Sequence, residues 1–328
     1  MRKLLILFLV GCSANSFSQV VRQRTVLLMG SRFDITISAK DSLSAEKYID
    51  ECIAEVSRIE NLLSDWKSDT QVSEVNRNAG IKPVKVDKEV FELTKRALNF
   101  SKITDGAFDI SFAAAEKIWK FDGSMTKLPS AEAVKESVKK IGYQNIILDE
   151  QHSTIFLKLP GMKIGFGALG EGYAADRCKE LMMAKGVPAG IVNGSGDMNT
   201  WGTQPDGTPW TIGITNPLNK NKVFAVMPLR DNAVTTSGSY EKFAMIDGKR
   251  YAHIINPKTG YPATGLSSVT VFGPSAEMAN GFSTSLMVMG KEAGLFLINQ
   301  FHDLKCVMVT DTGEVFGSDN VELIPNKK

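Results

Sequence analysis

Three clusters of small and polar residues follow one another between residues 235 and 284: Thr235-Thr-Ser-Gly-Ser-Tyr240, His253-Ile-Ile-Asn-Pro-Lys-Thr-Gly-Tyr-Pro262 and Ala279-Asn-Gly-Phe-Ser-Thr284. The prolines and the glycine of the second cluster predict a rigid turn. After this turn, Ser267 to Phe272 has the pattern of a strand, and we expect a helix from about Ser275 to Met289. The third cluster therefore lies on a helix that follows directly on a strand.

The region before this stretch combines strands with one helix. From Met162 onward the pattern is a strand, then the glycine-rich turn Gly165-Phe-Gly-Ala-Leu-Gly170, then a helix predicted from Glu171 to Lys185. Further segments alternate as strands do, and they include residues 189–192, 211–215 and 223–227.

The N-terminal part of the chain predicts a strand pair, two helices and a hairpin. Arg24 to Ser38 has two strand halves, broken at Met29-Gly30-Ser31, where glycine permits a bulge or the close approach of a ligand. A second helix fits Val90 to Ile103, and residues 145–148 and 154–159 fit a hairpin. The first helix is indicated by apolar residues at helical spacing: Ile49, Cys52, Ile53, Val56, Ile59, Leu62 and Leu63.

These elements predict an α+β fold with mixed, mostly antiparallel sheets and packed helices. Many of the connections between strands are too short for the crossovers that parallel strands need. The pattern changes near residue 160, which suggests two intertwined halves with a division there.

Bulk properties argue against several classes of partner. The 38 basic and 36 acidic residues are well mixed, so the chain lacks the electrostatic footprint of a nucleic-acid-binding protein. A small molecule or a protein is the expected partner. Cys52, Cys178 and Cys306 lack the spacing of a metal site, and their apolar surroundings predict buried free thiols.

The first residues have the pattern of an export signal. Met1-Arg-Lys3 is a basic start, and residues 4–10 form an apolar run that is too short to span a bilayer. We therefore expect residues 1–18 to be a signal peptide. Leu9-Val-Gly-Cys12 has the pattern of a lipobox, in which Cys12 is lipidated and becomes the mature N-terminus. The alternative is cleavage after Ser18, which leaves Gln19 first and no lipid.

The polar clusters contain side chains that suit a cation and an anionic ligand. Asn280 and Thr284 lie four residues apart on the predicted helix, so their oxygens share one face, with Ser283 next to them. Free backbone N–H groups at the start of the helix from Glu171 could face a phosphate. His253 is the only histidine within a motif.

Together with Met29-Gly-Ser31, Asp105-Gly-Ala-Phe-Asp109 and Gly170-Glu-Gly-Tyr-Ala-Ala-Asp176, the three clusters resemble the motifs of the ApbE-type family of FAD:protein FMN transferases. The motifs occur in the same order along nearly the whole mature chain. The resemblance implies a flavin transferase domain over residues 19–328 with a tunnel-fold-like architecture. It also implies FAD as the substrate and Mg²⁺ as the cofactor.

The resemblance also implies a set of site residues. His253 matches the best candidate for a catalytic base. Met29 and Trp66 match the two side chains that flank the isoalloxazine ring in the family, and Ser237 lies in the segment that matches the family's phosphate-region loop. The implied FAD-binding residues are Met29, Trp66, Ala107, Phe108, Asp109, Gly165, Glu171, Ser237 and Ile255, and the implied metal-site residues are Ala168, Asn280, Ser283 and Thr284.

Two positions depart from the family pattern by losing a carboxylate. Asn280 stands where the family has an aspartate, and Gly165 stands where it commonly has another. Since a hard divalent cation gains from ligand charge, Asn280 predicts a weaker metal site unless Asp197, Glu171 or the FAD pyrophosphate compensates. The two departures together affect the expected catalytic rate more than FAD binding.

The resemblance implies Mg²⁺-dependent transfer of FMN from FAD to a Thr or Ser hydroxyl of an acceptor protein, with release of AMP. The acceptor would be a subunit of an exported or membrane redox complex. The expected location is the periplasmic side of the inner membrane, with a lipid anchor at Cys12. The alternatives are an FAD pyrophosphatase, in which water replaces the hydroxyl, and a non-catalytic extracytoplasmic protein that binds or delivers flavin.

Overall fold

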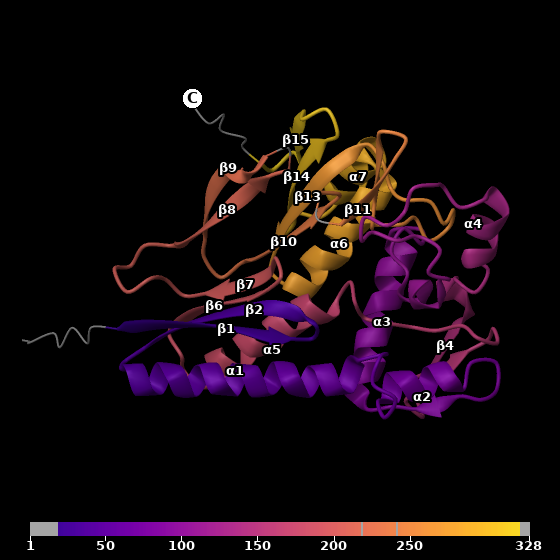
Figure 1. Cartoon of the computed structure of the whole chain (residues 1–328). Helices are drawn as coiled ribbons and strands as arrows, with labels where there is room; N and C mark the ends of the chain where they lie inside the picture. Colours follow the sequence, from indigo (N-terminus) through magenta and orange to yellow (C-terminus); the bar gives the residue numbers. More distant parts are fainter. Residues whose placement is uncertain (1–18, 218, 241, 322–328) are drawn as a thin grey trace, which may run out of the picture.

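A computed structural model of the chain describes residues 19–217, 219–240 and 242–321. The expected signal peptide and Cys12 lie outside these residues. The predicted α+β class is confirmed, because helices and largely antiparallel sheets pack together in one structure (Figure 1). Within the described ranges, no helix is both long enough and apolar enough to cross a bilayer.

The main sheet contains strands from both ends of the chain, and all of its pairings are antiparallel. The predicted break at Met29 is confirmed as a tight turn, since Met29 and Gly30 both have positive φ angles, of 54° and 74°. The strands in sheet order are β1 (Val20–Leu28), β2 (Ser31–Ala39), β6 (Ala189–Gly194), β7 (Asp197–Trp201), β10 (Ala233–Gly238), β13 (Leu266–Gly273), β14 (Lys305–Thr310) and β15 (Val315–Gly317).

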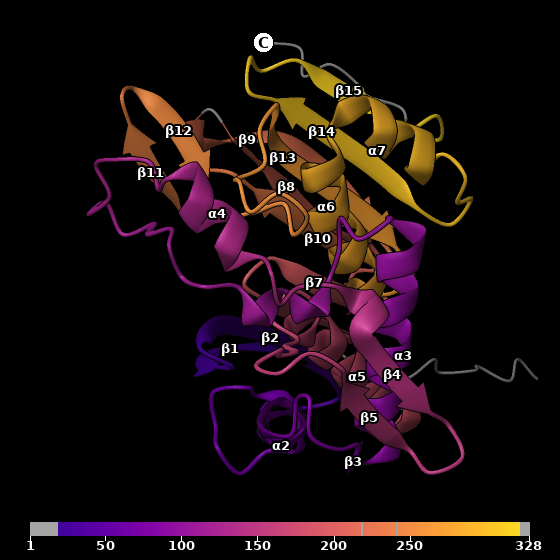
Figure 2. The ribbon, with the colours of Figure 1, turned by 90° about the vertical axis from the view of Figure 1, so that its right-hand side faces the viewer.

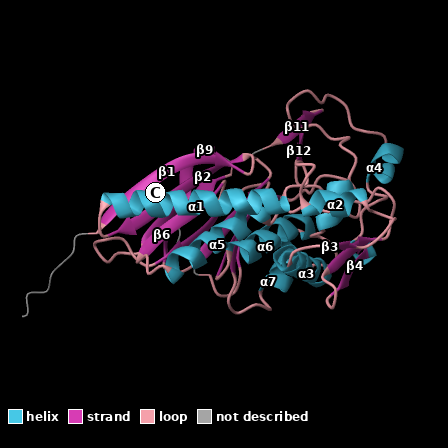
Figure 3. Cartoon of the chain, turned by 90° about the horizontal axis from the view of Figure 1, so that it is seen from below, coloured by secondary structure: helices cyan, strands magenta, loops and turns pink. Residues whose placement is uncertain are grey.

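Three helices cover one face of this sheet (Figure 3). α1 (Ser42–Leu63) packs on β1 and β2, α5 (Gly170–Ala184) packs on β6 and β7, and α6 (Ala276–Met289) packs on β10 and β13. The predicted first helix is confirmed, because the stripe of apolar side chains on α1 is buried against the sheet. Its buried residues are Ala45, Ile49, Cys52, Val56, Ile59 and Leu63.

A hairpin of β8 (Trp210–Asn216) and β9 (Asn219–Leu229) contributes to a second apolar cluster on the sheet. Ile212 and Leu229 of the hairpin pack with Phe272 of β13 in this cluster. Val269 of β13 belongs instead to the main core, as the alternation of side chains along a strand requires. All residues of β13 are therefore buried, and the strand lies at the centre of the fold.

The remaining elements lie along the side and the ends of the sheet (Figure 2). Arg96 connects them to the main sheet's helices, because its guanidinium donates to the Glu277 carboxylate on α6 at 2.8 Å and 2.9 Å. They are α2 (Gln71–Arg77), β3 (Val84–Lys85), α3 (Lys88–Ile103), η1 (Ile110–Ala114), α4 (Ala131–Ser137), η2 (Tyr143–Asn145), β4 (Ile146–Asp149), β5 (Thr154–Leu157), β11 (Phe243–Ile246), β12 (Lys249–Ala252) and α7 (Lys291–Ile298).

Two local predictions are wrong. The segment beginning at Met162 is not a strand, since residues 161–169 form turns and irregular backbone before α5. The cluster at residues 235–240 is not a loop in its first part, because Thr235 to Gly238 belong to β10 and pair with β13. Strands on both sides of residue 160 also share one sheet, since β2 pairs with β6 along its length.

Candidate functional site

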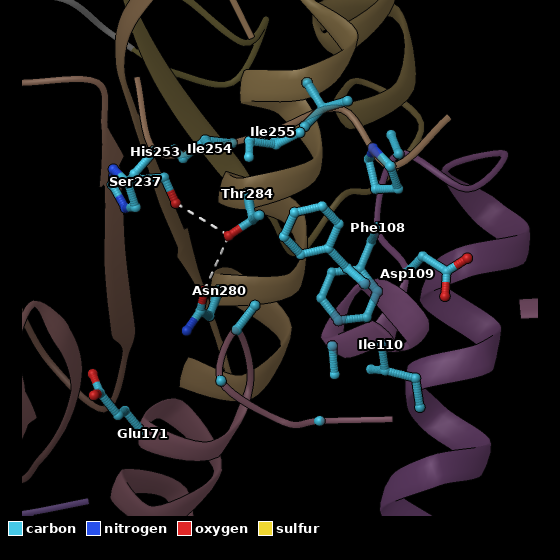
Figure 4. Close-up of a pocket in the computed structure, with 18 of the residues that line it drawn as sticks. Phe108, Asp109, Ile110, Glu171, Ser237, His253, Ile254, Ile255, Asn280 and Thr284 are labelled. Atoms are coloured by element: carbon cyan, nitrogen blue, oxygen red, sulfur yellow. Dashed lines mark hydrogen bonds between the residues drawn. The ribbon is translucent and has the colours of Figure 1, made fainter. Parts of the chain in front are cut away.

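Residues from many elements line a cavity of about 470 Å³ beside α6 (Figure 4). Of the side chains that the sequence predicted, most lie in its wall. These are Trp66, Ala107, Phe108, Asp109, Gly165, Ala168, Glu171, Ser237, His253, Ile255, Asn280 and Thr284. The cavity therefore joins segments that are separated by more than half of the chain.

A line of hydrogen-bonded polar groups runs across the wall between α6 and β10. The Thr284 hydroxyl donates to the Asn280 side-chain oxygen at 3.3 Å, as the i, i+4 spacing on a helix predicts. The Ser237 hydroxyl lies 3.3 Å from that of Thr284 and 2.8 Å from that of Ser283. These oxygens form a compact group of neutral acceptors on one side of the cavity (Figure 4).

Asp197 extends this line of polar groups at the start of β7. The Asn280 amide donates from Nδ2 to the Asp197 carboxylate, and Asp197 lies in the cavity wall with 8% of its surface exposed. Burial raises the pKa of Asp197 well above its ordinary value, and the nearby Glu171 carboxylate adds to the rise. The hydrogen bond from Asn280 opposes it. Asp197 is thus a strongly buried carboxyl group next to a second one.

A tight turn determines the position of Asp197. Gly194 and Asp197 are paired residues of β6 and β7, and Ser195 and Gly196 between them have φ angles of 49° and 108°. A two-residue hairpin with positive φ at both positions has this form, which favours glycine. Gly194 also leaves room for α5, because a Cβ atom there would lie 3.2 Å from the Glu171 Cβ. The turn therefore brings Asp197 and Glu171 to the same cavity.

The start of α6 is held by a half-buried carboxylate on α5, a structural role that the sequence did not indicate. Asp176 of α5 accepts hydrogen bonds from the Ser275 hydroxyl at 2.6 Å, the Ala276 N–H at 2.7 Å and the Glu277 N–H at 3.0 Å. The two backbone N–H groups are among those that the first turn of a helix leaves without partners. Asp176 thereby determines where α6 begins and so where Asn280 faces the cavity.

On the opposite side, the segment before η1 contributes apolar surface more than charge. Phe108 is buried and makes an edge-on ring contact with Phe100, with ring centroids 5.9 Å apart. The Asp109 carboxylate accepts hydrogen bonds from Ser111 and from the Tyr143 N–H, and it points away from the cavity (Figure 4). Asp109 therefore lines the cavity while its charge stabilises the start of η1.

Trp66 lies where this cavity meets a neighbouring one of about 800 Å³. The residue is 79% exposed, and the Lys117 ammonium lies 4.0 Å from the centroid of its ring. Trp66 and His253 line both cavities. An exposed indole at the entrance to a cavity can stack on a flat ligand without disturbing the core.

His253 follows β12 in a turn that the neighbouring residues hold rigidly. Its ring nitrogen Nδ1 lies 3.2 Å from the Lys242 carbonyl oxygen. Since a carbonyl can only accept, Nδ1 carries the proton in this contact, and the lone pair of the neutral ring is on Nε2. The Trp119 indole donates to the Gly260 carbonyl at 2.9 Å, which anchors the other end of the turn.

Two predicted site residues do not line the cavity. Met29 lies in the turn between β1 and β2, with its side chain beside Gly170 at the start of α5, and its N–H donates to Glu60 at 2.9 Å. Ser283 is fully buried behind the wall, and its hydroxyl donates to the Asn280 carbonyl at 3.1 Å. Ser283 therefore contacts the polar line from behind the wall.

Asp65, which sequence reasoning missed, lies next to Gly165. A Cβ atom on residue 165 would lie 3.3 Å from Asp65 Oδ2 and 3.0 Å from the Ala113 Cβ. A longer side chain at position 165 would thus compete with a carboxylate that already occupies this part of the cavity. Residues 65 and 165 are far apart in the sequence, so no local pattern could have indicated their contact.

The donors in the wall fit a hard cation better than a soft one. Within the described parts of the chain, no group of three or more His, Cys, Asp and Glu side chains could hold a metal ion. The oxygens of Asn280 and Thr284 lie 3.3 Å apart, close to the edge of about 3 Å between neighbouring ligands of octahedral Mg²⁺. The chemistry of the donor set is therefore compatible with Mg²⁺, which uses few protein ligands alongside water and phosphate.

Comparisons with known proteins agree with this architecture. The model of the ApbE family matches residues 29–308. An FAD:protein FMN transferase of Klebsiella pneumoniae is 31% identical over 318 residues, which cover 94% of this chain and 91% of the relative.

Solved structures are similar over nearly the same span. The crystal structure of the ApbE protein of Thermotoga maritima has a TM-score of 0.83 at 29% identity, and the match covers 92% of this chain and 97% of that one. The apo form of the Pseudomonas stutzeri flavinyl transferase ApbE has a TM-score of 0.81 at 29% identity, covering 92% and 96%.

Proposed function

Because this chain belongs to the ApbE family, we propose that it transfers FMN from FAD to a Thr or Ser hydroxyl of an acceptor protein and releases AMP, with Mg²⁺ as the cofactor. The observation that carries the proposal is one cavity in which His253 shares a wall with the polar line of Asn280, Thr284 and Ser237. Trp66, Phe108 and Phe112 are aromatic residues elsewhere in the wall, which suits a ligand with a flat ring and a charged pyrophosphate.

In the proposed reaction, the acceptor hydroxyl oxygen forms a bond to the flavin-side phosphorus of FAD. The bond from this phosphorus to the bridging oxygen of the pyrophosphate breaks, and AMP leaves. His253 takes the hydroxyl proton on Nε2, in keeping with the Nδ1 contact to Lys242. Trp66 and Phe108 bind the flavin ring and exclude water from it.

The cation would be held by the Thr284 hydroxyl, the Asn280 amide oxygen and the Ala168 carbonyl. Ala168 lies in the irregular segment just before α5 and lines the cavity. Mg²⁺ would neutralise negative charge on the pyrophosphate as the bond to AMP breaks.

The test is incubation of the purified protein with FAD, Mg²⁺ and a co-expressed acceptor domain from an exported redox complex. We expect AMP release together with an FMN adduct on a Thr or Ser of the acceptor, detected by mass spectrometry. AMP release without an adduct would indicate an FAD pyrophosphatase. FAD binding without AMP release would indicate a flavin-binding or delivery protein, and either result would overturn the proposal.

We further propose that the protein works outside the cytoplasm, on the periplasmic side of the inner membrane, anchored by a lipid on Cys12. The support is the basic start, the apolar run and the Leu9-Val-Gly-Cys12 pattern. Cys12→Ser is expected to release a soluble product or to leave the precursor uncleaved. A wild-type mature N-terminus at Gln19 would contradict the anchor.

A further inference from the structure

The contact between Asp197 and Asn280 orients the amide of Asn280. A carboxylate can only accept, so the Nδ2 group of Asn280 faces Asp197 and the Oδ1 atom faces Thr284. The amide thus joins a buried carboxylate on β7 to a hydroxyl on α6. One side of the resulting group is the Asp197 carboxyl group, and the other carries two neutral oxygens.

Two carboxyl groups lie in this part of the cavity. Glu171 and Asp197 both line the cavity, and Asp197 is more than nine-tenths buried. Across residues 19–217, 219–240 and 242–321, no lysine or arginine forms an ion pair with Asp197. Burying a carboxylate near a second one is costly unless a cation compensates for it. A divalent cation at the Asn280 and Thr284 oxygens would supply that positive charge.

We propose that Asp197 supplies the carboxylate of the divalent cation site, with Asn280 as both its hydrogen-bond partner and a neutral oxygen ligand. The inference rests on the proposed function for the identity of the cation. The negatively charged ligand would then come from β7, whereas the two neutral oxygen ligands, of Asn280 and Thr284, come from α6. Asn280 turns its oxygen toward Thr284 because Asp197 holds its NH₂ group.

The tight turn before β7 makes this assignment structurally possible. The positive φ angles of Ser195 and Gly196 reverse the chain immediately after Gly194, so Asp197 is the first residue of β7. A strand end held by a two-residue turn is a rigid place for a ligand. The matching end of α6 is held by Asp176, as described above.

The inference can be tested by metal binding without reference to turnover. Mn²⁺ is titrated into the full protein, first alone and then with saturating FAD, and free Mn²⁺ is measured by electron paramagnetic resonance, with Mg²⁺ as competitor. We expect Asp197→Asn to weaken Mn²⁺ binding at least tenfold. This substitution keeps the shape of the side chain but removes its charge. Mn²⁺ binding equal to that of the wild type would overturn the inference, as would no Mn²⁺ binding by the wild type.

Exchanging the carboxylate and the amide between positions 197 and 280 tests whether Asp197 is a ligand of the cation or only orients Asn280. The double variant Asp197→Asn/Asn280→Asp moves the carboxylate across the same hydrogen bond and keeps the total charge. We expect it to restore Mn²⁺ affinity to within about threefold of the wild type. Asn280→Asp alone, which adds a second carboxylate, should bind Mn²⁺ more tightly than the wild type. A double variant that binds no better than Asp197→Asn would also overturn the inference.

Asp122→Asn is the matched control, since Asp122 is an exposed loop residue that accepts hydrogen bonds from Ser124. It should leave Mn²⁺ binding unchanged. Melting curves show whether each variant is folded, and the double variant remains informative if a single variant is not. Metal binding and flavin transfer are independent measurements. If the wild type transfers flavin but its metal affinity does not depend on Asp197, this inference is wrong while the proposed function stands.

Discussion

Trp66 is an exposed aromatic side chain at the junction of the two cavities, so its contribution to FAD binding can be separated from stability. We expect Trp66→Ala to weaken FAD binding about twofold to tenfold, because stacking contributes about 0.5–1.5 kcal/mol beyond buried area. The melting temperature should not change, since 79% of the residue's surface is already exposed. Isothermal titration with FAD and a thermal melt measure the two effects.

The control is Phe296→Ala, which removes an exposed aromatic ring on α7, remote from the cavity lining. It should change neither quantity. If Trp66→Ala binds FAD as tightly as the wild type, the flavin ring lies elsewhere.

His253 is predicted to act on the acceptor hydroxyl and not on FAD binding. We expect His253→Gln to slow FMN transfer by about 10²- to 10⁴-fold, the usual contribution of a general base, with FAD affinity almost unchanged. The comparison variant is His152→Gln, because His152 lies on the surface and pairs with Asp149 in the hairpin turn. A His253 variant with near wild-type transfer would remove this residue from the mechanism.

At the level of elements, the close approach of α5 and α6 depends on a single glycine. A Cβ atom at Gly172 would lie 2.6 Å from the Ala276 carbonyl oxygen and 2.9 Å from the Glu277 N atom. Gly172→Ala should therefore push α6 away from α5 and cost about 1–3 kcal/mol of unfolding free energy. Urea denaturation measures this change.

The same substitution should weaken Mn²⁺ binding, because Asn280 and Thr284 move with α6. Gly167→Ala is the matched control for stability, since nothing lies within 4 Å of a Cβ atom at that position and its φ is not in the positive range. A Gly172 variant as stable as the wild type would show that the two helices can adjust without loss.

Glu89 of α3 connects α1 and α5, and its ionisation should make stability depend on pH. Hydrogen bonds from Arg58 hold the pKa of Glu89 below its ordinary value, and the Tyr173 hydroxyl donates to the same carboxylate at 2.6 Å. A carboxyl group with a lowered pKa in the folded state stabilises the protein above its unfolded-state pKa of about 4.3. That stabilisation is lost as the pH falls through the lower folded-state value.

We therefore expect Glu89→Gln to cost about 1 kcal/mol at pH 7, after allowance for solvent screening of the exposed Arg58, and to cost less below pH ~4. Denaturation at both pH values measures the difference. Glu150→Gln, which removes a surface partner of Lys95, should change stability little at either pH. A Glu89 variant with the same deficit at both pH values would contradict the assignment.

For the whole molecule, the shared sheet predicts that the chain unfolds as one unit. The part before residue 160 contains β2 and α1, whose partners β6 and α5 lie after it. A fragment of residues 19–160 should therefore lack a cooperative thermal transition by circular dichroism, whereas residues 19–328 should show a single one. A cooperative transition in the fragment would mean that the two halves are separate domains.

Periodicity in the sequence was sufficient for many elements of the fold. The stripe on α1, the broken strand pair β1 and β2, and the succession of β13 and α6 were all indicated by local patterns of apolar and polar residues. The segment of β10 matches a loop of the family, but Thr235 to Gly238 form a strand in this chain. Pairing with β13 and packing on α6 hold these residues in the sheet.

The sequence by itself determined the fold class and most of the residues that line the cavity. The order of the motifs along the chain can be read from the sequence alone, so it matches the family's order without a structure. Only the tertiary structure decided which groups meet there. It placed Asp197 against Asn280, Asp65 beside Gly165, and the Asp109 charge away from the cavity. These contacts join residues that are distant along the chain or depend on side-chain direction. The pairing of strands and the packing of helices establish such contacts, and no local spacing encodes them.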